Sequence, residues 1–283
     1  MKVRFSWNRI AQWVVVLACA LAIKQFYSTA SADQLRWILA PTTALVALVS
    51  DTSFEFESHA GYISGDHSFL IAPSCAGVNF LITAFLMLSV AKLVKDRSGD
   101  IAWRFIPAAG LVAYLVTLAA NTVRIAIALR MGRTSDVTWL DPRQLHRVEG
   151  IIVYFGFLML LFAVSERLSP GGHSALHRQS LLPLLVYYAT TLGIPVANGA
   201  YRQGTAFWEY SIFVLLIPLL FVMPIAVLSF YRRQTSTSTR TKAWAVTSTR
   251  SGHAVLPGDQ DRPPSADVCV EACATGCGLE RMG

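Results

Sequence analysis

Three short polar islands inside apolar stretches carry the side chains that could do chemistry. They are Pro73–Gly77 (PSCAG), Asn121–Arg124 (NTVR) and His146–Gly150 (HRVEG). Each lies near the end of an apolar segment, where ionisable groups are costly in a membrane unless they serve a purpose. Their thiol, guanidinium and imidazole supply a nucleophile, a stabiliser of negative charge and a base. We interpret this combination as a cysteine enzyme that works at a membrane surface.

Cys75 is the candidate nucleophile. A lone Cys in an apolar span is usually a small buried hydrophobe, and Cys19 fits that description. Cys75 differs because Pro73 and Gly77 flank it, and this pattern predicts that the thiol lies in the first turn of a helix. The positive end of the helix dipole would favour the thiolate there. Asn79, four residues on, is expected to share the helix face of Cys75 and to orient a partner.

Arg124 is the candidate charge stabiliser. The alternative is a structural arginine that extends to the membrane interface. Arg130 and Arg133 already serve that end of the segment, so Arg124, which lies deeper, needs an internal partner. Asn121 precedes it by three residues and projects from the same helix face.

His146 is the candidate general acid and base, because histidine can accept and return a proton near neutral pH. The alternative is an interfacial histidine without a chemical role. Its helix face continues through Gly150 and Tyr154, and Gly150 would let another helix or a substrate backbone come close. Arg147 follows directly and is a candidate for binding or orienting the substrate.

The composition indicates a polytopic membrane protein of the all-α class. Of the 283 residues, 54% are apolar and only 14% are charged, against about 25% charged in soluble domains. The formal net charge of +7 lies mostly in short loops and the C-terminal tail. We therefore interpret the charge as a signal of topology, and we expect no nucleic-acid partner.

Hydropathy predicts a bundle of six or seven membrane spans. About 20 apolar residues are needed to cross a bilayer core. The segment Leu35–Val49 is short and contains Pro41, so it is expected to be kinked, tilted or re-entrant, and the count stays open. The other candidates are Ile10–Tyr27, Phe69–Val94, Phe105–Leu129, Val148–Val164, Leu181–Ala200 and Tyr210–Tyr231.

Basic residues predict the orientation, because cytoplasmic loops are rich in Lys and Arg. The loops 92–104 and 165–180 and the tail are basic, whereas the segment 51–68 has four acidic residues and no Lys or Arg. Cys75, Arg124 and His146 then lie at similar depth on the outer face. Two features conflict with this orientation: the loop 130–147 is external yet carries four arginines, and seven full spans would place the basic N-terminus outside.

The two ends of the chain differ from the membrane region. The stretch 1–32 imitates a secretory signal, although an uncleaved first helix is the favoured interpretation. We expect a membrane domain over residues 1–231 and a disordered, basic, Ser/Thr-rich tail over 232–283. The tail holds Cys269, Cys273 and Cys277, which lack a fourth ligand for a tetrahedral metal site. No metal or other cofactor is expected.

The three islands resemble the exosortase/archaeosortase family of membrane-embedded cysteine transpeptidases. The matching text is Cys75-Ala76-Gly77, then Asn121-Thr122-Val123-Arg124, then His146 followed by Gly150, and the resemblance covers about residues 35–165. It implies that Cys75 is the nucleophile, His146 the general acid and base, and Arg124 the stabiliser of the oxyanion or of the active-site charge. The chain departs from better-known bacterial members in lacking an appended soluble domain.

The resemblance also implies the partners and the location. The substrates would be secreted proteins with a C-terminal signal, composed of a short motif (Pro-Glu-Pro in the best-known bacterial case), a hydrophobic helix and a basic end. They would be cut at the outer, periplasmic side of the bacterial plasma (inner) membrane and passed to an unknown acceptor amine or to water. Arg143 and Arg147 would hold an acidic residue of the motif.

Two rival interpretations remain. A transporter would use Arg124 to bind its solute and would tolerate replacement of Cys75, and inverted repeats would support it, but the sequence shows none. A non-catalytic membrane assembly protein would be indifferent to changes at Cys75, Arg124 and His146. A thiol oxidoreductase is disfavoured because Cys75 has no Cys-x-x-Cys partner.

Overall fold

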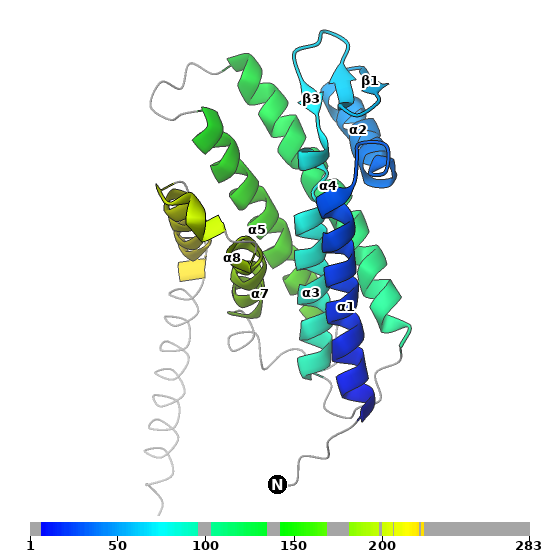
Figure 1. Ribbon diagram of the computed structural model, residues 1–283, viewed down its shortest axis with the longest axis vertical. Helices are drawn as coiled ribbons and strands as arrows, with labels where there is room; N and C mark the ends of the chain where they lie inside the picture. The colour runs from blue at the N-terminus through cyan, green and yellow to red at the C-terminus, as the bar shows by residue number, and fades with distance from the viewer. Residues whose placement is uncertain are drawn as a thin grey trace, which may run out of the picture. The chain divides into compact units, whose positions relative to one another are not determined.

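The structure is a computed structural model of the chain and consists mostly of helices (Figure 1). It describes residues 7–95, 103–134, 142–168, 181–197, 200–205, 207–220 and 222–223. The tail 232–283, with the disorder expected there and its three cysteines, lies outside the described residues.

Four helices are long and apolar enough to cross a membrane: Trp7–Thr29, Pro73–Lys95, Phe105–Met131 and Arg147–Leu168. They correspond to α1 (Trp7–Thr29), α3 (Val78–Lys95) with the turn before it, α4 (Phe105–Thr134) and α5 (Pro142–Leu168). The membrane character expected from the composition is supported, and the count of six or seven spans stays a prediction.

The remaining apolar helices have fewer residues than the four long ones. α2 (Arg36–Ser50) has 15 residues and contains Pro41, so it is too short to cross a bilayer core without distortion. The segment expected at Leu181–Ala200 is interrupted after Thr191 and divides into α7 (Leu181–Thr191) and α8 (Gly193–Ala197). A further apolar helix covers Phe207–Leu220, after the short 3-10 helix η3 (Ala200–Gln203).

A small sheet corrects the all-α expectation. Between α2 and α3 the chain forms three antiparallel strands in the order β1-β2-β3, with bounds Phe54–Glu57, Gly61–Ser64 and Leu70–Ile71. The alternation of Phe and Glu in β1 is the period-two pattern of a half-buried strand, a signal that the hydropathy of long spans obscured.

In the turn after β2, hydrogen bonds from Ser64 and Ser68 lower the pKa of Asp66 to about 2.

α3 is the central helix of the bundle and packs against α1, α4, α5 and α7. Hydrogen bonds join the helix ends on one side: Arg9 donates to the Leu93 carbonyl at 2.8 Å, and Lys95 donates to Glu166 at 3.3 Å. The start of α1 and the ends of α3 and α5 therefore lie together. Figure 1 shows the sheet and the turn before α3 at the opposite end.

The Lys95–Glu166 pair provides a test of this packing. The Glu166 side chain is only 5% exposed, so Lys95→Met would leave a buried carboxylate without its cation. We expect a loss of about 1–3 kcal/mol in stability, measured as a lower melting temperature in detergent. The double variant Lys95→Met/Glu166→Gln should regain most of it. Equal melting temperatures for wild type and Lys95→Met would contradict the helix packing at this end.

Candidate active site

A tight turn presents Cys75 at the entrance to α3. The chain leaves β3 and forms a 3-10 turn, η1 (Pro73–Cys75), in which the Cys75 amide donates to the Ala72 carbonyl at 2.8 Å. Gly77 then adopts φ +74°, and its carbonyl accepts the amides of Phe80 and Leu81. α3 begins only at Val78, so the expectation that the thiol lies in the first turn of this α-helix is wrong. A positive φ at Gly77 ends one helical turn and starts the next.

A chain of hydrogen bonds joins this turn to α4 and α5. Asn121 Nδ2 donates to the Cys75 carbonyl at 2.6 Å, and Tyr154 OH donates to Asn121 Oδ1 at 2.9 Å. Arg124 Nη1 donates to the Tyr154 hydroxyl at 3.1 Å. Asn121 and Arg124 thus share a helix face, as expected; Asn121 contacts the Cys75 turn, and Arg124 is linked to it through Tyr154.

Two glycines, which have no side chain, make this close approach possible. A Cβ at Gly150 would lie 3.1 Å from Arg124 Nε, so the glycine leaves room for the guanidinium against α5. A Cβ at Gly77 would lie 3.2 Å from Asn121 Cγ. A close approach at Gly150 is expected from the sequence, and the group that approaches is Arg124.

Arg124 lies among groups that compensate its charge. Besides the Tyr154 hydroxyl, the buried carboxylate of Glu149 interacts electrostatically with the guanidinium. The guanidinium also lies 5.3 Å from the centroid of the Tyr154 ring, within the range of a cation–π interaction. The internal partner that the sequence analysis required of Arg124 is therefore present.

The site lies about one membrane thickness from the basic helix ends. At 1.5 Å per residue, Arg124 is about 28 Å along α4 from Phe105, and Gly150 is about 27 Å along α5 from Leu168. A bilayer hydrocarbon core is about 30 Å thick. If the basic ends of the helices lie at one interface, the Arg124–Tyr154 layer lies near the other.

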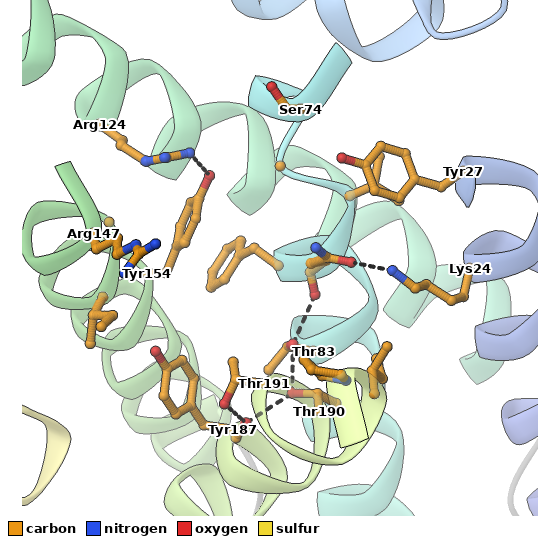
Figure 2. A pocket seen from close by; sticks show the side chains of 18 of the residues that line it. Lys24, Tyr27, Ser74, Thr83, Arg124, Arg147, Tyr154, Tyr187, Thr190 and Thr191 are labelled. Carbon is orange, nitrogen blue, oxygen red and sulfur yellow. Dashed lines mark hydrogen bonds between the residues drawn. The ribbon is translucent and has the colours of Figure 1, made fainter. Parts of the chain in front are cut away.

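A cavity of about 580 Å³ opens beside the turn. Figure 2 shows Lys24 and Tyr27 on one side of it and Arg124, Arg147 and Tyr154 on the other. Its lining contains three cationic side chains and, among the described residues, no Asp or Glu. Ser74 and Gly77 line it on either side of Cys75, while Cys75 itself is half-buried and outside the lining.

The other expected site residues fall in different places. Arg147 lines the cavity, as does Asn79, whose Oδ1 accepts a hydrogen bond from Lys24 Nζ at 3.1 Å. Asn79 therefore orients Lys24, although it does not share a continuous helix face with Cys75. Position 146 lies in the first turns of α5, but the His146 side chain is outside the described part of the structure.

Three of the cavity residues that the sequence did not single out as site candidates make hydrogen bonds around the Cys75 turn. They are Lys24, Tyr27, whose hydroxyl lies 3.4 Å from the Pro73 carbonyl, and Tyr154. A lysine inside an apolar span was a usable signal for Lys24, since such a charge is costly without a role. Tyrosine is common in membrane helices, so nothing in the sequence distinguished Tyr27 and Tyr154 from packing residues.

No family model matches the chain, and no curated protein or solved structure is significantly similar to it. Within the described residues, no group of three or more His, Cys, Asp or Glu side chains could hold a metal ion.

Gly77→Ala tests the turn. Alanine at φ +74° is strained, and its Cβ would press on Asn121, so we expect a loss of about 1–3 kcal/mol in stability. The measurement is thermal unfolding in detergent. Gly110→Ala is the matched control, because nothing lies within 4 Å of its Cβ. If both variants unfold like the wild type, the left-handed turn before α3 is incorrect.

Proposed function

We propose that the protein is a membrane-embedded cysteine transpeptidase or protease that cleaves the C-terminal sorting signal of secreted proteins. The observation that carries this proposal is the hydrogen-bonded chain from the Cys75 carbonyl through Asn121 and Tyr154 to Arg124, beside a cavity. Three segments far apart in the sequence contribute to it. A thiol, a guanidinium and a cavity for a peptide are what amide cleavage by a cysteine requires.

The residues support a two-step reaction. The Cys75 thiolate attacks the carbonyl carbon of the scissile amide and forms a tetrahedral adduct, whose oxyanion Arg124 stabilises. The adduct collapses to a thioester as the C–N bond breaks, and His146 in its protonated form gives a proton to the leaving amine. An acceptor amine or water, deprotonated by His146, then attacks the thioester and releases the Cys75 thiolate.

Arg124 suits its proposed role because a guanidinium presents its N–H donors in a fixed, planar arrangement that matches an anion, and Tyr154 holds this one in place. An oxyanion donor of this kind contributes about 3–4 kcal/mol to the stability of a transition state.

The proposed location is the bacterial plasma (inner) membrane, crossed six or seven times, with the site on the outer side. The arrangement of charge supports this orientation. Arg9, Lys95 and Arg167 lie at the helix ends opposite the sheet, and cytoplasmic ends of membrane helices are rich in such residues. A scissile bond just before the membrane helix of a secreted substrate would then be at the depth of Cys75.

A transporter for an anionic solute is the second candidate. The observation that favours it is the lining of the cavity, which contains Lys24, Arg124 and Arg147 and, among the described residues, no carboxylate. The two functions differ in what they require of the thiol, because only the peptidase needs the sulfur of Cys75.

Cys75→Ala is the decisive test of the peptidase. We expect it to abolish processing of a co-expressed protein with a tripartite C-terminal signal, while the abundance of the variant stays unchanged. The measurement is an immunoblot of precursor and product in membranes. Cys19→Ala is the matched control, since Cys19 packs in the bundle core and should process normally. Full processing by Cys75→Ala would reject the enzymatic function; Arg124→Ala and His146→Ala should each be severely impaired.

Arg147→Glu tests whether the cavity recognises an acidic motif residue. We expect processing of a Pro-Glu-Pro signal to fall about tenfold or more, because two like charges would meet, and a Pro-Arg-Pro signal to regain part of it. The measurement is the processing rate for each pair of enzyme and signal. Arg130→Glu is the control, since Arg130 is outside the cavity lining. Equal rates for all pairs would show that Arg147 does not read the motif.

A further inference from the structure

We propose that Tyr154 is a positioning residue: its hydroxyl couples Arg124 to the Cys75 backbone through Asn121 and holds the turn that presents the thiol. The inference deepens the proposed function and rests on it for its effect on catalysis. The coupling itself concerns only the shape and reactivity of the Cys75 turn, which can be measured without a substrate.

The direction of each hydrogen bond follows from what its atoms can do. The Cys75 carbonyl can only accept, so the Asn121 amide must turn its Nδ2 toward it, as the 2.6 Å contact shows. Asn121 Oδ1 is then the acceptor that faces Tyr154, and the phenolic proton points to it at 2.9 Å. The phenolic oxygen keeps a lone pair for the Arg124 Nη1 donor at 3.1 Å. The Tyr154 hydroxyl therefore donates its hydrogen bond to Asn121 Oδ1.

The charge at one end of this chain strengthens the bonds along it. A cationic donor on a phenolic oxygen makes the phenol a better donor, and hydrogen bonds in series polarise one another. The bond that results holds the carbonyl of Cys75 just before the left-handed Gly77. Arg124 thus acts on the Cys75 turn through the two side chains between them, Tyr154 and Asn121.

The ring of Tyr154 has a separate task. It stacks on Phe80 with centroids 4.9 Å apart and planes at 12°, and Arg124 lies over its face. Phenylalanine at 154 would keep both contacts and lose only the hydroxyl. The single oxygen of Tyr154 can therefore be tested apart from the packing of α3 against α5.

The substrate-independent measurement is the rate at which iodoacetamide modifies Cys75 in membranes, followed by mass spectrometry of the Cys75 peptide. In Tyr154→Phe, Arg124 loses its hydroxyl acceptor, and Asn121 loses the donor that orients its amide toward the Cys75 carbonyl. We expect modification to be about tenfold slower, the size that one lost hydrogen bond supports. Tyr187→Phe is the matched control: Tyr187 lines the same cavity and packs on Phe155, but its hydroxyl is not part of the chain.

The catalytic measurement is the processing of the tripartite-signal protein. We expect Tyr154→Phe to lower kcat about tenfold with KM unchanged, because a positioning residue acts on the reacting thiol and leaves substrate binding intact. Asn121→Ala should have a similar effect, and the double variant Tyr154→Phe/Asn121→Ala should be no worse than Asn121→Ala alone. Such non-additivity is expected of residues in one network. The melting temperature of Tyr154→Phe should stay close to that of the wild type.

The outcomes separate this inference from the proposed function. Wild-type modification and processing rates in Tyr154→Phe would overturn the positioning role and leave the peptidase intact. Additive effects of Tyr154→Phe and Asn121→Ala would also overturn it, as would a large drop in melting temperature together with an unchanged modification rate. Slower modification in Tyr154→Phe combined with full processing by Cys75→Ala would keep the coupling and reject the peptidase.

Discussion

The site depends on one requirement: a buried polar group must find a hydrogen-bond partner, because leaving it without one costs free energy. The carbonyl of Cys75 is freed when the chain leaves the sheet and makes a left-handed turn at Gly77, and Asn121 supplies its hydrogen bond. The Asn121 side-chain carbonyl then needs a donor, which Tyr154 supplies, and the Tyr154 hydroxyl in turn accepts a hydrogen bond from Arg124. The polar side chains of three segments are thereby fixed relative to one another.

The apolar packing around these groups makes the requirement strict. α3 is buried by α1, α4, α5 and α7, and its residues Phe80 and Thr83 contribute both to packing and to the cavity. Thr83 and Thr190 bond to each other at 2.9 Å and so join α3 to α7 below the cations. These two hydroxyl groups of the deeper cavity wall are thus hydrogen-bonded within the protein. The charged groups Lys24, Arg124 and Arg147 line the same cavity, and Asn79 and Tyr154 hold the first two in place.

Much of the fold could be predicted because membrane helices are recognised by their long apolar stretches. α1 and α4 contain the spans expected at Ile10–Tyr27 and Phe105–Leu129. The sheet escaped the same reasoning, since four-residue strands leave almost no hydropathy signal and β3 was absorbed into the start of a span. The late beginning of α3 could not be predicted in this way either. It depends on the left-handed conformation of Gly77, which lies against Asn121, a residue 44 positions later in the sequence.

The amino-acid sequence by itself determined the kinds of groups available and the ends of the helices on which they sit: a thiol, an asparagine three residues before an arginine, and a glycine on the following helix. Those features follow from residue type and helical period, which are local. Only the tertiary structure decided that Arg124 occupies the space left by Gly150, that Lys24 crosses to Asn79, and that Tyr154 lies between Arg124 and Asn121. These are contacts between segments, and they depend on how the helices pack and on which buried polar atoms remain to be satisfied.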